Sequence, residues 1–143
     1  MKALACITCL TCLACSQGFR TDEARAEKGA HVIQITAAEV DLTASAQESA
    51  AEACTSWRLT AAQAELFFML SKKIDSRTYH HTYDTMPCKI SGVVKADGKV
   101  WKFTINGAAK AQWWTETRIR YFGCEAKECE PLVIDPYVDP SGL

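Results

Sequence analysis

The densest group of side chains that can carry acid–base or metal chemistry lies between Tyr79 and Asp84, where the sequence reads Tyr-His-His-Thr-Tyr-Asp. Two imidazoles and a carboxylate can bind zinc or iron, which makes His80, His81 and Asp84 the candidates for a metal site. Adjacent histidines point apart in an extended segment, however, and no third histidine lies close by in the sequence. We therefore expect a solvated connecting loop with no metal, no cofactor and no catalytic residue.

No other stretch of the sequence matches a known catalytic pattern. The chain has no nucleophile elbow, no glycine-rich phosphate loop and no pair of carboxylates arranged as in a glycosidase. The sequence therefore favours a binding protein. The alternative is a small periplasmic hydrolase or metal-dependent enzyme that uses His80, His81 and Asp84.

Basic residues are concentrated between residues 85 and 120, which hold seven lysines or arginines against Asp97 and Glu116, although the formal net charge of the chain is −1. With Trp113 and Trp114 nearby, a basic face of this kind can bind nucleic acid or an anionic glycan. For an exported protein we expect instead that the lysines solvate the outer face of a one-sided sheet, with no nucleic-acid partner. Adjacent strand residues point to opposite faces, so one ring of the Trp113–Trp114 pair is a candidate interface aromatic.

Export is predicted by the first fifteen residues, in which Lys2 precedes a short apolar run that ends in Leu-Ala-Cys-Ser at residues 13–16. The run is too short to span a bilayer, which needs about 20 residues. Its end resembles the lipobox of bacterial lipoproteins, which implies lipid modification of Cys15, while Ser16 implies anchoring to the outer membrane. The alternative is ordinary cleavage near Gly18, which would release a soluble periplasmic protein. Residues 16–30 are polar and predict a tether, and residues 31–143 are expected to form a single α+β domain.

Four cysteines remain after the signal: Cys54, Cys88, Cys124 and Cys129. An even number in an oxidising compartment predicts two disulfides, whereas a four-thiolate zinc site would need closer cysteine pairs than Cys54 and Cys88 provide. We expect Cys124 to pair with Cys129 across a tight loop, and Cys54 to join the start of a hairpin at Cys88. Cys88 and Cys124 are expected at opposite ends of the sheet, which disfavours their pairing.

One main helix is predicted from residue 61 to about residue 75. Thr60 and Gln63 form a capping box at its start. A stripe of apolar residues should face the core, and it consists of Ala62, Leu66, Leu70 and Ile74, with Phe67 beside it. Phe68 points nearly the opposite way. Either a second layer covers Phe68 or it is an exposed anchor for a partner, so Phe68 joins Trp113 and Trp114 as a candidate interface residue.

The strongest pattern in the sequence is a β-hairpin. Asp97-Gly98 suits a type I′ turn, and both flanking runs alternate between apolar and polar residues. A two-residue loop sets three apolar pairs on one face: Val94 with Trp101, Gly92 with Phe103, and Ile90 with Ile105. The opposite face is mostly polar. The turn type and the alternation of apolar residues thus predict the same register.

Further strands are expected at residues 110–114 and 118–123, which would extend the hairpin into an antiparallel meander. We also expect a short strand at residues 31–35, a weak helix within residues 37–53 and an edge strand at residues 131–134. With the main helix packed on the apolar face of the meander, the predicted fold class is α+β in two layers, stapled by disulfides.

Three segments, at residues 83–92, 98–106 and 121–124, resemble those of small exported proteins and lipoproteins of Gram-negative bacteria. The resemblance covers roughly residues 54–132. It implies location and fold only, because no activity is known in that family.

The combined expectation is a periplasmic or membrane-tethered interaction protein, for example an inhibitor or an immunity-type protein. Its partner would be another protein of the envelope, and a lipid anchor would hold it at the outer membrane.

Replacing Cys15 with alanine should abolish the incorporation of radiolabelled palmitate into the protein in growing cells, because the lipid would be attached at that thiol. Gel autoradiography of the wild type and of Cys15→Ala measures the label. Label that persists in the variant would contradict the lipoprotein interpretation.

Overall fold

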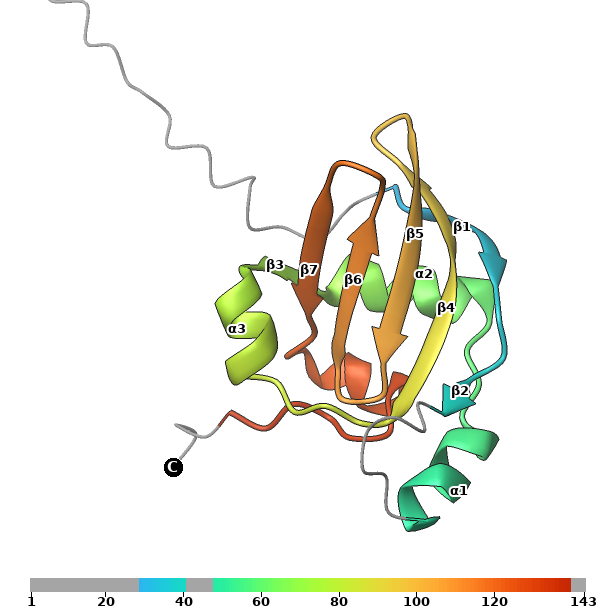
Figure 1. Cartoon of the computed structure of the whole chain (residues 1–143), viewed down its shortest axis with the longest axis vertical. Coiled ribbons are helices and arrows are strands. Elements are labelled where there is room, and N and C mark those ends of the chain that lie inside the picture. The colour runs from blue at the N-terminus through green and yellow to red at the C-terminus, as the bar shows by residue number, and fades with distance from the viewer. Residues whose placement is uncertain (1–28, 41–47, 140–143) are drawn as a thin grey trace, which may run out of the picture.

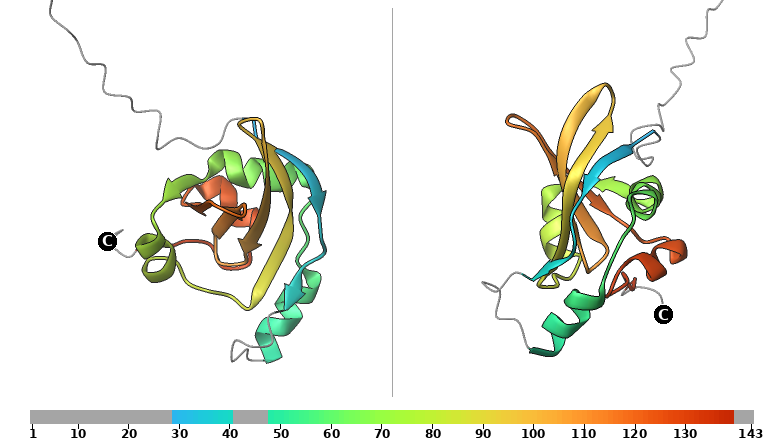
Figure 2. Two further views of the ribbon diagram at one scale, coloured as in Figure 1. Left: turned by 45° about the horizontal axis from the view of Figure 1, so that its top comes forward. Right: turned by 90° about the vertical axis from the view of Figure 1, so that its right-hand side faces the viewer.

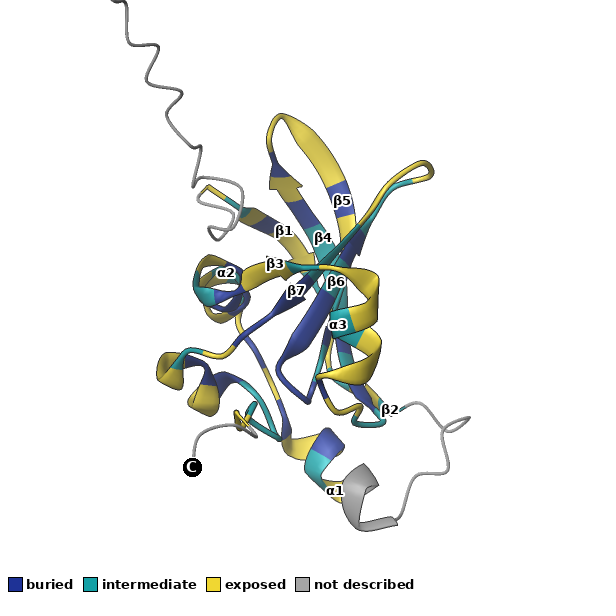
Figure 3. Ribbon diagram, turned by 90° about the vertical axis from the view of Figure 1, so that its left-hand side faces the viewer, coloured by how far each residue is buried: buried dark blue, intermediate teal, exposed yellow. Residues whose placement is uncertain are grey.

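The computed structural model describes residues 29–40 and 48–139 (Figure 1). The predicted export signal, Cys15 and residues 16–28 of the predicted tether lie outside this range. The described chain folds into a seven-stranded antiparallel sheet with helices α2 and α3 on opposite sides (Figure 3). Two disulfides staple it. The α+β class predicted from the sequence is therefore confirmed.

The order of the elements along the chain is β1 (His31–Ile35), β2 (Glu39–Val40), α1 (Glu48–Ser56), α2 (Ala61–Leu70), β3 (Lys72–Ile74), α3 (Ser76–His81), β4 (Cys88–Ala96), β5 (Lys99–Asn106), β6 (Lys110–Trp114), β7 (Ile119–Gly123) and the 3-10 helix η2 (Lys127–Leu132). In space the strands follow the order β1-β4-β5-β6-β7-β3, and β2 pairs with β4. Strands β4 to β7 are the meander predicted from the sequence.

The β4–β5 hairpin has the predicted register, with Val94 opposite Trp101 and Gly92 opposite Phe103. Both turn residues have positive φ, 51° at Asp97 and 69° at Gly98, as a type I′ turn requires. Close packing in this hairpin requires a glycine at position 92. A Cβ atom at this position would lie 2.1 Å from the Gln34 carbonyl oxygen and 2.5 Å from the Phe103 ring.

Helix α2 closes the core on one face of the sheet through Ala64, Phe67 and Phe68. The Phe68 ring makes edge contacts with the rings of Phe103 and Trp113, at centroid distances of 5.2 and 4.9 Å. The candidate interface role of Phe68 is therefore wrong, because the side chain is fully buried.

The predicted buried stripe of this helix is wrong in part, although Phe67 is buried as predicted. Ala62 is exposed and Leu66 keeps 37% of its surface exposed, while the helix ends at Leu70 and Ile74 belongs to strand β3. The sequence of α2, Ala-Ala-Gln-Ala-Glu-Leu-Phe-Phe-Met-Leu, has apolar residues on nearly every side. Periodicity therefore cannot select its inner face, and the two large phenyl rings are buried in preference to smaller side chains.

Two other segments differ from expectation. The weak helix expected within residues 37–53 is found in part, because α1 covers Glu48–Ser56, while Glu39–Val40 form strand β2. The expected edge strand at residues 131–134 is absent from the described chain, where η2 carries Cys129 and Pro131 instead. Proline lacks the N–H that a strand ladder needs, and Cys129 is tied back to Cys124 across a short loop.

Both predicted disulfides are present, Cys54–Cys88 and Cys124–Cys129. One reason given for this pairing was wrong, however. The Cys88 carbonyl accepts a hydrogen bond from Gly107, and the Cys124 N–H donates to Ala109, so both cysteines lie at the same end of the sheet. Strands β5 and β6 separate them.

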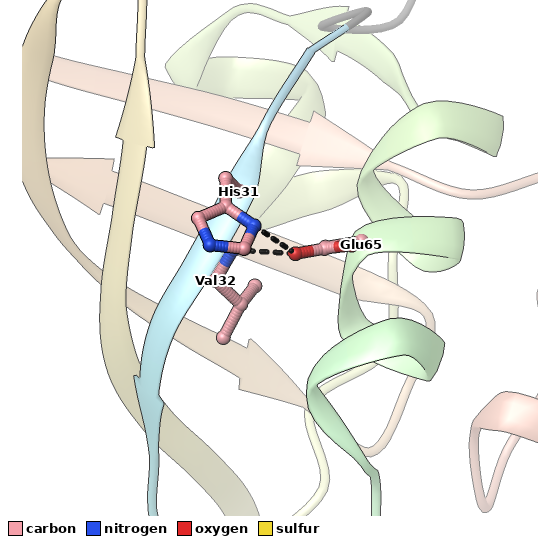
Figure 4. Close-up of polar contacts among 3 residues, drawn as sticks. All are labelled: His31, Val32 and Glu65. Atoms are coloured by element: carbon pink, nitrogen blue, oxygen red, sulfur yellow. Dashed lines mark hydrogen bonds and ion pairs between the residues drawn. The ribbon is translucent and has the colours of Figure 1, made fainter.

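Strand β1 is fastened to helix α2 by one carboxylate (Figure 4). Glu65 Oε1 accepts a hydrogen bond from the Val32 backbone N–H at 2.8 Å, and it lies 3.0 Å from His31 Nδ1. Val32 itself is buried against the core. The helix thus covers β1, which is the last strand at this edge of the sheet (Figure 2).

Gly92→Ala should lower the free energy of unfolding by more than about 2 kcal/mol, because the new methyl group meets the backbone oxygen of Gln34, which cannot rotate away. Val93→Ala, one residue along on the outer face, should cost about 1 kcal/mol or less. Urea unfolding followed by circular dichroism measures both. A loss at Gly92 no larger than that at Val93 would refute the close approach.

Candidate functional site

The face of the sheet that points away from α2 carries a group of apolar side chains around one tryptophan. Cross-strand pairing aligns Val93 with Lys102, Lys102 with Trp114, and Trp114 with Ile119. Val100 precedes Lys102 by two residues and therefore lies on the same face of β5. Val100 and Ile119 expose 58% and 51% of their surfaces, and Val93 and Trp114 are half-buried. We call Val93, Val100, Lys102, Trp114 and Ile119 the Trp114 surface.

A shallow hollow lies on each side of the Trp114 ring. One, of about 400 Å³, is lined by Val93, Val100 and Lys102 from the β4–β5 hairpin and by Thr115 and Glu116 from the β6–β7 turn. The tips of these two hairpins splay apart (Figure 2). The other hollow, of about 460 Å³, is lined by Gln112 and residues 115–119. Trp114 borders both, so a bound molecule could contact the indole from either side.

Three cations lie within or beside the Trp114 surface. Lys95 is the cross-strand neighbour of Val100, Lys102 is the neighbour of Trp114, and Arg118 lines the same hollow as Trp114 and Ile119. All three are exposed, and none forms a salt bridge within the described part of the chain. Glu116 is the acidic residue that lines both hollows.

The lower part of the same face is covered, because Lys110 holds the chain after α3 against the sheet. Lys110 is 2% exposed. Its Nζ donates to the carbonyl oxygens of Tyr79 and Tyr83, at 3.2 and 3.4 Å, and to Thr85 Oγ1 at 2.5 Å. It also lies 4.7 Å from the centre of the Tyr79 ring. Burial lowers the pKa of the Lys110 ammonium group, and the nearby charge of Asp84 opposes that shift.

Tyr83 is the second anchor of this covered region. Its ring occupies the space above Gly123, where a Cβ would lie 2.2 Å from the ring, and it packs on Tyr137 at 4.7 Å between centroids. Its hydroxyl donates to Glu125 Oε1 at 3.0 Å, and burial raises the Tyr83 pKa. The hydrogen bond from Lys72 lowers the pKa of Glu125. The side chains of Tyr83, Glu125 and Lys72 thus bond to one another and stabilise the fold.

The candidate metal ligands do not come together. His80 and His81 are exposed in the last turn of α3, and Asp84 is exposed three residues later. Among the described residues, no group of three or more His, Cys, Asp or Glu side chains could hold a metal ion. The expected loop is in part a helix, because Asp75 caps α3 by accepting from the Thr78 N–H. That capping pattern was readable from the sequence.

Of the three candidate interface aromatics, Trp114 alone has an exposed portion. Trp113 is fully buried and lies opposite Phe103 on the inner face, so its candidate interface role is wrong. The residues that sequence reasoning missed are Val93, Val100 and Ile119. The hairpin register already placed the two valines on the outer face, and continuing it around the next turn would have assigned Trp114 and Ile119 to the same face.

The chain matches no family model, and no curated protein or solved structure matches it either. Within residues 29–40 and 48–139, no helix is both long and apolar enough to cross a membrane.

Tyr79 predicts how stability changes in alkaline solution. Burial raises its pKa to about 12, so above pH 10 the folded chain keeps a proton that the unfolded chain loses. The free energy of unfolding should therefore fall between pH 10 and pH 12, and Tyr79→Phe should make that fall shallower. The lowered pKa of Lys110 acts in the opposite direction, but only below its ordinary value of 10.5. Urea unfolding across this range measures the slope, and an unchanged slope in Tyr79→Phe would mean that the hydroxyl is solvated.

Proposed function

We propose that this chain is an exported, non-catalytic binding protein that docks another protein of the cell envelope through the Trp114 surface. The observation that carries the proposal is a half-buried tryptophan at the centre of an exposed apolar group on the face of a sheet. Tryptophan is enriched among the residues that dominate binding energy at protein interfaces.

The local structure favours binding with little loss of conformational freedom. Trp114 and its neighbours are fixed on strands that pair along their length, and Lys110 and Tyr83 hold the lower half of the same face. A preorganised surface pays less entropy on association than a mobile one. The polar and charged residues around the apolar centre resemble the rim of an interface between proteins that exist separately.

The proposed location is the periplasm, with attachment to the outer membrane through a lipid on Cys15. Two disulfides support export, because such bonds persist in oxidising compartments. In this setting the protein would act as an inhibitor or as an immunity-type protein that blocks an enzyme or toxin in the envelope. No observation favours the enzyme alternative at His80, His81 and Asp84.

Site-specific photocrosslinking in cells tests the proposal directly. A benzophenone amino acid placed at Val100 or Trp114 should crosslink the chain to one defined envelope protein. The same probe at Glu128, exposed on η2, should not. Crosslinking from Glu128 to the same protein, or none from position 114, would overturn the proposed docking surface.

Trp114→Ala should weaken the purified complex by at least about 2 kcal/mol, roughly thirtyfold in Kd, because the central anchor is lost. Met69→Ala is the matched control, since Met69 is an apolar residue on α2 with 50% of its surface exposed. Isothermal titration gives both affinities, and thermal unfolding checks that each variant is folded. Equal effects of the two variants would contradict the assignment.

A further inference from the structure

From the charges around the Trp114 surface, we infer that the partner presents an acidic protein surface with an apolar or aromatic centre. This inference rests on the proposed function and adds the chemistry of the partner. Lys95 and Lys102 lie beside the apolar centre on the β4–β5 hairpin, and Arg118 lines the hollow on the β6–β7 side of Trp114. The cations therefore lie on both sides of Trp114.

These cations differ from Arg120, Lys72 and Lys110, whose charges are engaged within the fold. Arg120 pairs with Asp97 at 3.1 Å and Lys72 pairs with Glu125 at 2.8 Å, while the Lys110 ammonium is enclosed by two carbonyls and a hydroxyl. Lys95, Lys102 and Arg118 have no such partner in the described chain. Positive charge that the fold does not neutralise therefore collects at the Trp114 surface, although the whole chain has a formal net charge of −1.

Covering this surface with a neutral partner would be unfavourable. Contact removes water from three cations, and without opposing carboxylates that desolvation has no compensation. A partner with Asp and Glu side chains around an apolar centre regains the lost interaction and is steered toward the site before contact. Val100, Trp114 and Ile119 would meet the apolar centre of the partner.

An anionic lipid surface has the right charge but the wrong shape for this site. A membrane would be met first by the hairpin tips, which are the most protruding parts of this end of the sheet (Figure 1). Those tips are polar, with Asp97-Gly98-Lys99 in one and Thr115-Glu116-Thr117 in the other, and Asp97 is paired with Arg120. Trp114 lies behind them, between two hollows on the sheet face. The polar tips would therefore keep Trp114 away from a flat lipid surface.

Binding of simple polymers tests the inference before the partner is known. The full chain is titrated at low ionic strength with a random copolymer of glutamate and tyrosine, with polyglutamate, and with a copolymer of lysine and tyrosine, and tryptophan fluorescence is followed. We expect the glutamate–tyrosine copolymer to bind most tightly and the lysine copolymer not to bind. No binding of the glutamate–tyrosine copolymer, or tighter binding of the lysine copolymer, would overturn the inference.

Charge variants locate the binding. Changing Lys95, Lys102 and Arg118 together to glutamine should weaken binding of the glutamate–tyrosine copolymer at least about tenfold, because the opposing charges are lost. Lys127→Gln, an exposed lysine on η2, should change it little. Equal losses in the two variants would overturn the inference, since the attraction would then be unspecific.

The other occupants are tested in the same assay. Polygalacturonate carries one carboxylate per sugar, as polyglutamate does per residue, and vesicles of phosphatidylglycerol present an anionic lipid surface. Tighter binding of either one than of the glutamate–tyrosine copolymer, lost in the triple variant, would replace the acidic protein with a glycan or a membrane.

If crosslinking at position 114 captures a protein with a basic surface, this inference fails while the proposed function stands. If no protein is captured there, the proposed function fails whatever the polymers do.

Discussion

The register of the β4–β5 hairpin is the constraint on which the rest of the molecule depends. The Asp97-Gly98 turn sets Trp101, Phe103 and Ile105 on the face that α2 covers, and it leaves Val100 and Lys102 on the other face. Strand β6 pairs with β5, so the register of β5 also determines which side chains of β6 face the core. Trp113 therefore enters the aromatic core, while its neighbour Trp114 turns outward. A shift of one residue would exchange the two tryptophans and expose the core.

One end of the outer face of the sheet is covered by other elements, and the other end is accessible. At the lower end, Lys110 and Tyr83 draw α3 and the following segment onto the sheet, and both disulfides lie close to the turn at residues 107–109. At the upper end the hairpins separate and their outer side chains remain accessible (Figure 2). The same sheet thus has a closed half that gives rigidity and an open half with side chains available for contact.

The sequence was most informative where local rules act alone. A turn that requires positive φ predicted the hairpin, and the short spacing of Cys124 and Cys129 predicted their disulfide. It was least informative for α2, since a helix that is apolar on nearly every side does not indicate which side is buried. The Lys110 contacts were also beyond reach, because they join residues 25 to 31 positions apart, and two of the three are with backbone carbonyls that any sequence would supply. The Trp114 surface lies between these cases: register predicts the face, but only the tertiary fold shows how much of it α3 leaves open.

The carboxylate of Glu65 has a consequence beyond joining α2 to β1. Edge strands offer unpaired backbone amides to strands of other molecules, and this is a common route to aggregation. At Val32 that amide is already occupied by Glu65. A second copy of the chain would have to displace a charged hydrogen bond before it could add a strand at this point. Copies crowded together on one surface would therefore be protected at this position from polymerising through their sheets.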